Sequence, residues 1–434
     1  MRPFLFGAAL LLPAPLLAQL SSQPAPAGVP PEQPGPPPVL RISGELRVRP
    51  EGYDGGAFNA SNGDGYMLTR MLLGAGIQTS RLTMFFVQGM DAQAPGKNKL
   101  PAGPPFRDYA DLRQAYFQLG PESAQWVRVG RFELAFGEGR LVGSLPWANT
   151  ARTFDGGRAA LVRPGYRVDV FAASVVKVDQ GRFDKNIPGN NFYGVYSSFD
   201  SLLKKGVAEP YFFWRRQSGI PTGLAATGTM SFGTLGLRAA GRLPAHWDYN
   251  VEMAAQRGGL AQEKIAAWAG HWLLGYTMSG AALQPRPFAE FNAASGDENP
   301  TDDKRGTFDQ LYPTGHEKYG LTDLVGWQNM KHMRTGIDLA LPRRWTGTVR
   351  YSNYWLAKPR DALYSGSGAV VARSPSGSAG TYVGREVDAI ASGRLVASLT
   401  TSLGVGRLLP GTFLKNTTPG ATYTYTYLML VYAF

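Results

Sequence analysis

Single arginines at alternate positions are the residues of this sequence whose type and spacing could do chemistry. In the segment 40–49, Arg41, Arg47 and Arg49 lie on one side of an extended chain, and apolar residues lie on the other. A guanidinium group stays charged and binds a carboxylate through two parallel hydrogen bonds. The pattern therefore predicts a basic, water-facing surface that binds carboxylated molecules. The other arginines that alternate with apolar neighbours are Arg70, Arg128, Arg167 and Arg350.

Side chains suited to catalysis or to soft metals are scarce. The chain has no Cys and 4 His, without an HExxH or HxH pair, so thiolate and histidine-based metal sites are not expected. The stretch 201–204 fits the form S-x-x-K, but this pattern is common by chance and its partner motifs are missing. The sequence therefore favours a protein that is not an enzyme and that needs no cofactor.

An acidic segment near residue 300 offers hard oxygen ligands of the kind that Ca²⁺ prefers. Its spacing matches no EF-hand loop, so a solvated loop is the better interpretation and a calcium site is a weak candidate. The four carboxylates concerned are Asp297, Glu298, Asp302 and Asp303.

The elements that must position the arginines are strands. From residue 40 onward, alternating segments of roughly ten residues follow one another, about 18 in all. The clearest are 40–49, 246–257 and 345–355. The connections alternate between short ones, such as 78–80, and long ones, such as 91–110. This parity is typical of membrane barrels, and a soluble sandwich has no reason to keep it. We therefore predict an all-β fold, a transmembrane antiparallel β-barrel over residues 40–434 with short periplasmic turns and long extracellular loops.

The beginning of the chain has the composition of a targeting segment. Arg2 precedes a run of small and apolar residues, which predicts a signal peptide at 1–18. The proline-rich, nearly uncharged stretch 19–39 cannot form a core, and we expect a disordered periplasmic leader there.

The end of the chain predicts a closing strand. Leu428, Leu430, Tyr432 and Phe434 fall on one face of an extended segment that stops without a polar tail. A barrel that pairs its last strand with its first leaves no exposed edge, and a bilayer covers the apolar face. Together with the signal peptide, this strand indicates a bacterial outer membrane.

Two blocks of spaced motifs carry a family resemblance. The first contains LRQAYFQLG at 112–120, VRVGR at 127–131, GEGRLVG at 137–143 and RTFDGGR at 152–158. The second contains ASGD at 294–297, GTFDQLYP at 306–313 and GWQN at 326–329. In this order, the motifs resemble those of the alginate export family of outer-membrane barrels.

The resemblance implies a monomeric barrel of about 18 strands with a basic constriction that passes an acidic polysaccharide. It adds four arginines to those expected in the pore, namely Arg131, Arg140, Arg152 and Arg158. One departure is Phe132, where the family pattern would place Gln after the Gly-Arg pair.

These observations predict an outer-membrane channel that passes an anionic solute through an arginine-lined pore, with an alginate-like polysaccharide as the first choice. The alternatives are a general porin for small solutes and, less favoured, an outer-membrane barrel hydrolase. The net charge of +12 is not gathered in basic runs, so no nucleic acid partner is expected. The expected partners are the lipid bilayer, an anionic polysaccharide or small anions, and periplasmic export or assembly proteins.

Overall fold

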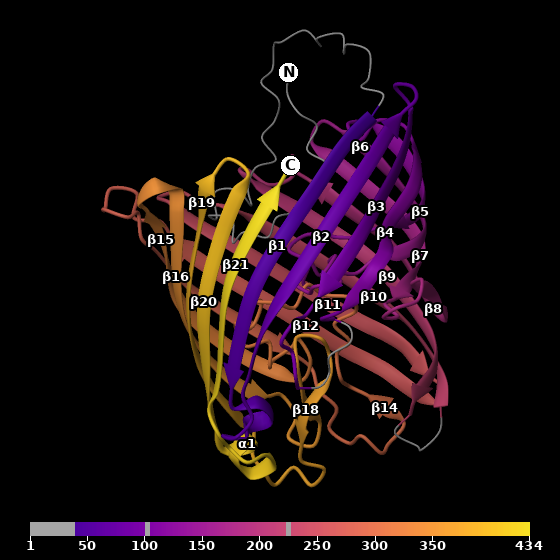
Figure 1. The fold of residues 1–434 in the computed structure, drawn as a ribbon. Helices are drawn as coiled ribbons and strands as arrows, with labels where there is room; N and C mark the ends of the chain where they lie inside the picture. Colours follow the sequence, from indigo (N-terminus) through magenta and orange to yellow (C-terminus); the bar gives the residue numbers. More distant parts are fainter. Residues whose placement is uncertain (1–39, 100–104, 223–226) are drawn as a thin grey trace.

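The structure is a computed structural model that describes residues 40–99, 105–222 and 227–434. The predicted signal peptide (1–18) and leader (19–39) lie outside these residues. The predicted barrel, 40–434, coincides with the described part of the chain and its two short gaps. Figure 1 shows one barrel of long, tilted strands.

Eighteen antiparallel strands of the described residues form this closed barrel, as predicted. Each expected segment corresponds to one strand, with its boundaries shifted by a few residues. In chain order the strands are β1 (Leu40–Asp54), β2 (Asp64–Gln78), β3 (Thr83–Gln93), β4 (Asp108–Leu119), β5 (Gln125–Phe132), β6 (Phe154–Arg163), β7 (Tyr166–Lys177), β8 (Lys185–Phe199), β9 (Gly206–Pro221), β10 (Thr227–Arg242), β11 (Trp247–Leu260), β12 (Glu263–Tyr276), β13 (Arg286–Ala294), β15 (Met330–Leu341), β16 (Trp345–Leu356), β19 (Tyr382–Val396), β20 (Leu399–Pro410) and β21 (Tyr423–Ala433).

The remaining elements are short. The strand β14 (Lys304–Arg305) pairs in parallel with β12, and β17 (Ala362–Tyr364) forms a hairpin with β18 (Val370–Arg373). The helical turns are η1 (Gly56–Phe58), η2 (Pro342–Arg344) and α1 (Thr412–Thr417). Among the described residues, no helix is long and apolar enough to cross a membrane.

Side chains alternate along the strands between an exposed, apolar outer face and a buried inner face. In β1, Leu46 is 47% exposed, whereas Arg47 and Arg49 are 3% and 2% exposed. In β21, Leu430 is exposed while Val431 is buried. Because successive side chains of a strand point to opposite faces, the apolar residues form the outer wall and the arginines of β1 point into the barrel.

The barrel closes where β21 pairs with β1, as the terminal segment predicted. The N–H of Gly44 donates to the carbonyl of Phe434 at 2.9 Å, and the N–H of Phe434 donates back at 3.1 Å. The Phe434 ring lies across Gly44, where a Cβ atom would be 2.2 Å from the ring. A side chain at residue 44 would therefore require the last aromatic ring to move.

The start of β1 and the end of β21 lie at one end of the barrel, while α1, β14 and β18 lie at the other (Figure 1). At the first end, strands are joined by short connections such as 79–82, 164–165 and 397–398, and we call it the turn end. At the other end, the loop end, the connections include 133–153, 295–329 and 357–381. The two-residue connection 261–262 is an exception at the loop end.

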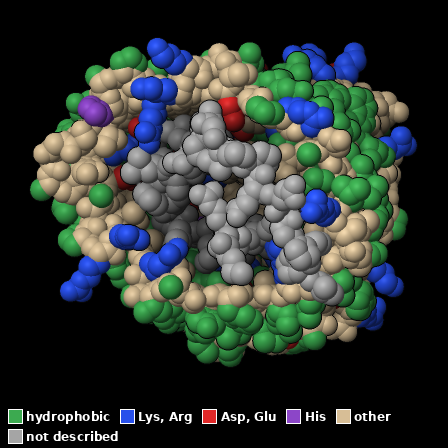
Figure 2. Space-filling view, turned by 90° about the horizontal axis from the view of Figure 1, so that it is seen from above, with side chains coloured by type: hydrophobic (Ala, Val, Ile, Leu, Met, Phe, Trp, Pro, Cys, Tyr) green, Lys and Arg blue, Asp and Glu red, His purple; other side chains and the backbone are tan. Residues whose placement is uncertain are grey.

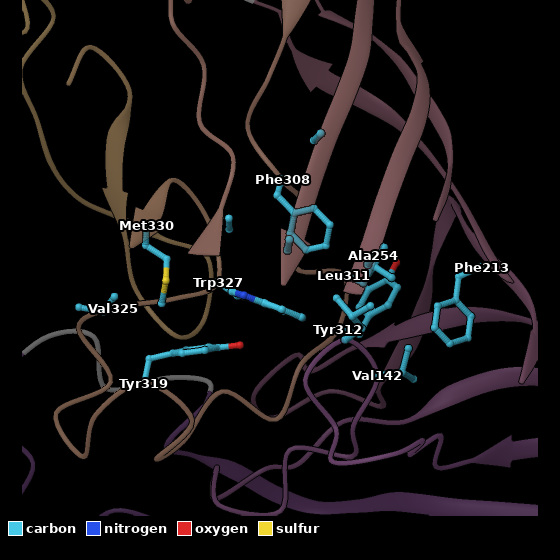
Figure 3. Packing of buried hydrophobic residues seen from close by; sticks show 14 of the residues in the cluster. Val142, Phe213, Ala254, Phe308, Leu311, Tyr312, Tyr319, Val325, Trp327 and Met330 are labelled. Atoms are coloured by element: carbon cyan, nitrogen blue, oxygen red, sulfur yellow. The ribbon is translucent and has the colours of Figure 1, made fainter. Parts of the chain in front are cut away.

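Two loop-end connections, 133–153 and 295–329, fold into the barrel and supply much of its apolar core. Val142 of the first and Phe308 of the second are buried in one cluster with Phe213 of the wall strand β9. Figure 3 shows Val142 and Tyr312 near Phe213, with Phe308 in the same group of packed side chains. These contacts place both loops between the walls, where they can act on a passing solute.

Candidate functional site

The candidate site is the lumen, where loops 133–153 and 295–329 meet. Val142 and Tyr312 form a parallel bridge between the two loops. The N–H of Tyr312 donates to the carbonyl of Leu141, and the N–H of Gly143 donates to the carbonyl of Tyr312, each at 2.8 Å. The loops are therefore joined by backbone hydrogen bonds, and a solute in the lumen meets them as one body.

Arg47 and Arg70, which are register partners on β1 and β2, hold loop 133–153 against the wall. Arg47 donates to the carbonyls of Pro146 and Ala148 at 2.8 and 3.2 Å. Arg70 donates to the same two carbonyls at 3.0 and 3.1 Å. Arg70 also pairs with Glu45 at 2.6 Å, whereas no described carboxylate lies within 4.0 Å of Arg47. Arg47 thus keeps a positive charge that no ion pair neutralises.

Arg49 connects β1 to both inward loops. It pairs with Glu51 at 2.6 Å, donates to the carbonyl of Trp147 at 2.6 Å and lies over the Trp147 ring at 3.7 Å. The ring of His316, from loop 295–329, also stacks on Trp147, with the two ring centroids 3.7 Å apart. Trp147 therefore couples the two loops through aromatic stacking and cation–π contact.

Arg140 lies at the inner tip of loop 133–153 among carboxylates of the opposite wall. It lies 3.6 Å from Glu290 of β13, 3.3 Å from Glu138 of its own loop and 3.0 Å from the Nε2 atom of His271. Burial would raise the pKa of Glu138, but Lys318 and nearby arginines outweigh it and lower this pKa to about 2. Arg140 therefore anchors the loop by charge, and its charge is compensated.

Arg152 and Arg350 tie down loop 295–329. Arg152 donates to the carbonyl of Pro313 at 2.9 Å and to that of Gly143 at 3.2 Å, with no described carboxylate within 4.0 Å. Burial lowers the pKa of Arg152 to about 10, so the group is still charged at neutral pH. Arg350 of β16 pairs with Glu317 at 3.2 Å. Arg152 therefore resembles Arg47 in carrying an unneutralised charge.

Three predicted arginines form a cluster towards the turn end. Arg158 of β6 and Arg167 of β7 both pair with Asp169, at 2.8 and 2.6 Å. Arg128 of β5, the register partner of Arg158, pairs with Glu122 of the 120–124 turn at 2.7 Å. The cluster lines the wall. Unlike Arg47, its three arginines have no described hydrogen bond to a backbone carbonyl of the inward loops.

The last two predicted arginines lie apart from this arrangement. Arg131 stays on the side of Val127 and Val129, and it pairs there with Asp155 of β6 at 2.7 Å. Arg41 is half-buried near the start of β1. Phe132, the departure from the family pattern, is fully buried and faces Phe154 in register.

Sequence reasoning missed several inward arginines. Except for Arg113, they occupy positions that the two-residue period of their strands assigns to the lumen, so extending the alternation strand by strand could have found them. Arg113 lies at a β-bulge of β4 and has the opposite parity from the inward Tyr116 and Gln118, so the period alone would have placed it outside. Each pairs with a carboxylate, for example Arg238 with Glu209 and Arg334 with Glu290. The set is Arg113, Arg215, Arg238, Arg286 and Arg334.

The acidic segment near residue 300 does not converge on one point. Glu298 pairs with Lys358 at 2.8 Å, and Asp302 accepts a hydrogen bond from the N–H of Lys304. Asp297 accepts from the N–H of Asn299, and the backbone carbonyl of Asp303 accepts from Lys264. Within the described ranges, these four carboxylates form no group of three close enough to share a cation.

A serine–histidine pair occurs at the turn end, away from the lumen. Ser279 and the Nε2 atom of His246 are 3.5 Å apart, both exposed, and no described carboxylate lies within 4.0 Å of His246. Ser201 of the S-x-x-K stretch donates to the carbonyl of Gly165 in another exposed turn. Neither site has the base and orienting acid that a serine nucleophile requires.

Comparison with known proteins agrees with this architecture. The model of the alginate export family matches residues 39–427. The chain belongs to the alginate export family. Like the family, it is an outer-membrane β-barrel of the channel type, so the turn end is periplasmic and the loop end is extracellular. No curated protein matches the chain.

Solved structures of porin-like barrels from Pseudomonas aeruginosa share the fold of this alginate export family member. OccK5 (OpdH) is 10% identical over 91% of this chain and 97% of its own, with a TM-score of 0.62. OpdK with vanillate is 12% identical over 91% and 98%, with a TM-score of 0.61. OccK11 (OpdR) is 14% identical over 91% and 95%, with a TM-score of 0.57.

The contact between His316 and Trp147 makes loop packing sensitive to pH. Burial opposes the charge of His316, but Asp323 and Glu317 outweigh it and raise its pKa to about 9. A pKa above the unfolded value of about 6.5 means that protonation stabilises the packed loop. This stabilisation is fully present below about pH 6.5 and is lost as pH rises through about 9.

We therefore expect channel openings to become more frequent between pH 7 and pH 10 in single-channel recordings. The same titration of His316→Gln, which cannot be protonated, should be flat. Burial lowers the pKa of Lys318 in the same loop, so Lys318 could titrate in this range as well. A pH response that persists unchanged in His316→Gln would assign the effect to Lys318 or another group.

Proposed function

We propose that this barrel is an anion-selective channel and that its solute is an alginate-like, carboxylated polysaccharide. The observation that carries the proposal is that the charges of Arg47 and Arg152 are not paired with a described carboxylate. Both guanidinium groups lie at the inward loops, and their described partners are neutral oxygens rather than carboxylates. A positive charge held in a low-dielectric lumen attracts anions and repels cations.

The neutral partners also suggest how a solute passes. A uronate carboxylate forms charge-assisted, bidentate bonds with a guanidinium, which are stronger than bonds to a backbone carbonyl. A carboxylate that reaches Arg47 can therefore displace the carbonyls of Pro146 and Ala148. This exchange would loosen loop 133–153 as the chain of sugars advances, and weak repeated contacts would keep it moving.

The periplasmic rim supports passage from the periplasm to the outside. Figure 2 shows this end, with lysine and arginine side chains around the rim and apolar side chains on the outer wall. The exposed acidic residues of the turns here are Glu122 and Asp200. The exposed basic residues of the turns and adjoining strand ends are Arg81, Arg163, Lys204, Lys205, Arg242, Arg343, Arg344 and Arg394. Such a rim concentrates an anionic polymer at the entrance that an exported chain meets first.

A second candidate is a porin for small carboxylates. The fold neighbour OpdK was solved with vanillate, a small carboxylated aromatic compound. The same arginines would bind such an anion through the same bonds. The polysaccharide channel and the small-carboxylate porin differ in one expectation. In the polysaccharide channel, a chain of linked uronates should bind more tightly than a single uronate.

Planar-bilayer recording of the purified full-length protein tests the proposal. We expect an anion-selective reversal potential in a salt gradient and a current that oligouronate blocks. Block by oligouronate at about a tenth or less of the concentration needed for monomeric glucuronate would favour the polysaccharide, because linked sites raise avidity. Equal block by both would favour the small-anion porin. A cation-selective channel would contradict the proposal.

A further inference from the structure

Three carboxylates come together at the extracellular end of the wall, outside the loops described above. Asp108 and Asp111 belong to β4, and Asp184 is the last residue before β8. One oxygen atom from each lies within 4.8 Å of the others. The side chains are 0%, 5% and 7% exposed, respectively, so the group is buried.

A β-bulge brings Asp108 and Asp111 to the same side. In a regular strand, residues three apart point to opposite faces. Here Asp111 faces Met90 and Asp108 faces Ala92, so Asp91 faces two residues of β4. Ala110 within the bulge has a φ of 37°, a conformation that residues with a side chain seldom adopt. Bulges often re-aim side chains at functional sites, and this one directs two carboxylates towards Asp184.

Asp184 is held in the cluster by backbone contacts. Its N–H donates to the Oδ2 atom of Asp111 at 2.6 Å, and its Oδ1 atom accepts from the N–H of Asp179 at 2.8 Å. These bonds orient the connection 178–184 across β4, but each leaves carboxylate oxygens with spare acceptor capacity. The position of connection 178–184 is therefore set by hydrogen bonds to carboxylates that repel one another.

Asp108 is the member that the protein leaves without a partner. Neither of its carboxylate oxygens has a hydrogen-bond partner, although the side chain is completely buried. The nearby cation is Arg131, which pairs with Asp155 and donates to the backbone carbonyl of Asp184 at 2.9 Å. A buried, unpaired carboxylate beside two others is unfavourable in its charged form, and either protonation or a bound cation relieves this cost.

We propose that Asp108, Asp111 and Asp184 bind a divalent cation, with Ca²⁺ as the preferred ion. All three ligands are hard oxygens, and the cluster contains no His or Cys that would favour zinc or copper. Ca²⁺ accepts irregular oxygen geometry, whereas Mg²⁺ requires a near-ideal octahedron and retains several waters, which a buried cluster cannot accommodate easily. The bound ion fastens connection 178–184 to β4 at the extracellular mouth.

Calorimetric titration of the full-length protein in detergent, after treatment with EGTA, tests this site. We expect one Ca²⁺ to bind per chain, more tightly than Mg²⁺, and the melting temperature to rise. Asp108→Asn should weaken Ca²⁺ binding by about tenfold or more. It should also melt at a higher temperature than the wild type in EGTA, because the neutral amide removes repulsion between the carboxylates.

Two further variants separate this site from general effects. Asp184→Asn changes the same cluster from its loop side and should also lose Ca²⁺ binding, which keeps the test valid if Asp108→Asn does not fold. Asp303→Asn removes one exposed negative charge of the segment near residue 300 and should bind Ca²⁺ like the wild type. Absence of Ca²⁺ binding to the wild type, or equal binding by all variants, would overturn the proposal.

Discussion

Replacing Arg47 and Arg152 together by Gln is expected to lower the anion-to-cation permeability ratio by about an order of magnitude. The described partners of both lumenal guanidinium groups are neutral, so their loss removes charge that no carboxylate already compensates. Arg140 offers a useful contrast because it lies near Glu138 and Glu290. Arg140→Gln should disturb loop packing more than selectivity.

The double variant should also open more often than the wild type. Arg47 anchors loop 133–153 to β1, and Arg152 links this loop to Pro313 of loop 295–329. Reversal potentials and open probabilities in planar bilayers measure both effects. Arg343→Gln combined with Arg394→Gln removes the same charge from exposed positions at the periplasmic end and serves as the matched control. Equal loss of selectivity in both double variants would place the selective charge at the rim rather than at the loops.

A disulfide between the two inward loops is expected to reduce current by about tenfold or more if their separation opens the pore. The natural chain has no Cys, so Gly143→Cys with Thr314→Cys would introduce a single possible bond. A Cβ atom on residue 143 would lie 2.9 Å from the Cβ atom of Thr314. Typical disulfides place these atoms about 3.5–4.5 Å apart, so the loops need to shift by about 1 Å.

The oxidised and reduced forms of the same protein provide the comparison. Reduction should restore current to the level of the two single-cysteine variants, which cannot form the bond. Barrel integrity in the oxidised form can be checked by resistance to unfolding in detergent without heating. An oxidised double variant that conducts like the reduced form would show that solutes pass without separation of the two loops.

The sequence was sufficient to predict the barrel because its two-residue period is local. A lipid-facing wall requires an apolar residue at every second position, and Leu46, Val48 and Leu430 satisfy this independently of any distant contact. The same rule placed Arg47, Arg49 and Arg70 inside. It was less useful at the strand ends, where Arg131 remains on the outer side and pairs with Asp155.

The partners of the inward arginines could not be predicted from strand period. Arg47 contacts residues about a hundred positions away in a loop that has no period of its own. Similarly, Asp108 and Asp111 meet because a bulge breaks the alternation that would otherwise separate them. The sequence alone determined the strands and the closure by the terminal segment, since these follow from local alternation. Only the tertiary structure decided which charges are neutralised, because loops 133–153 and 295–329 reach their partners across the lumen.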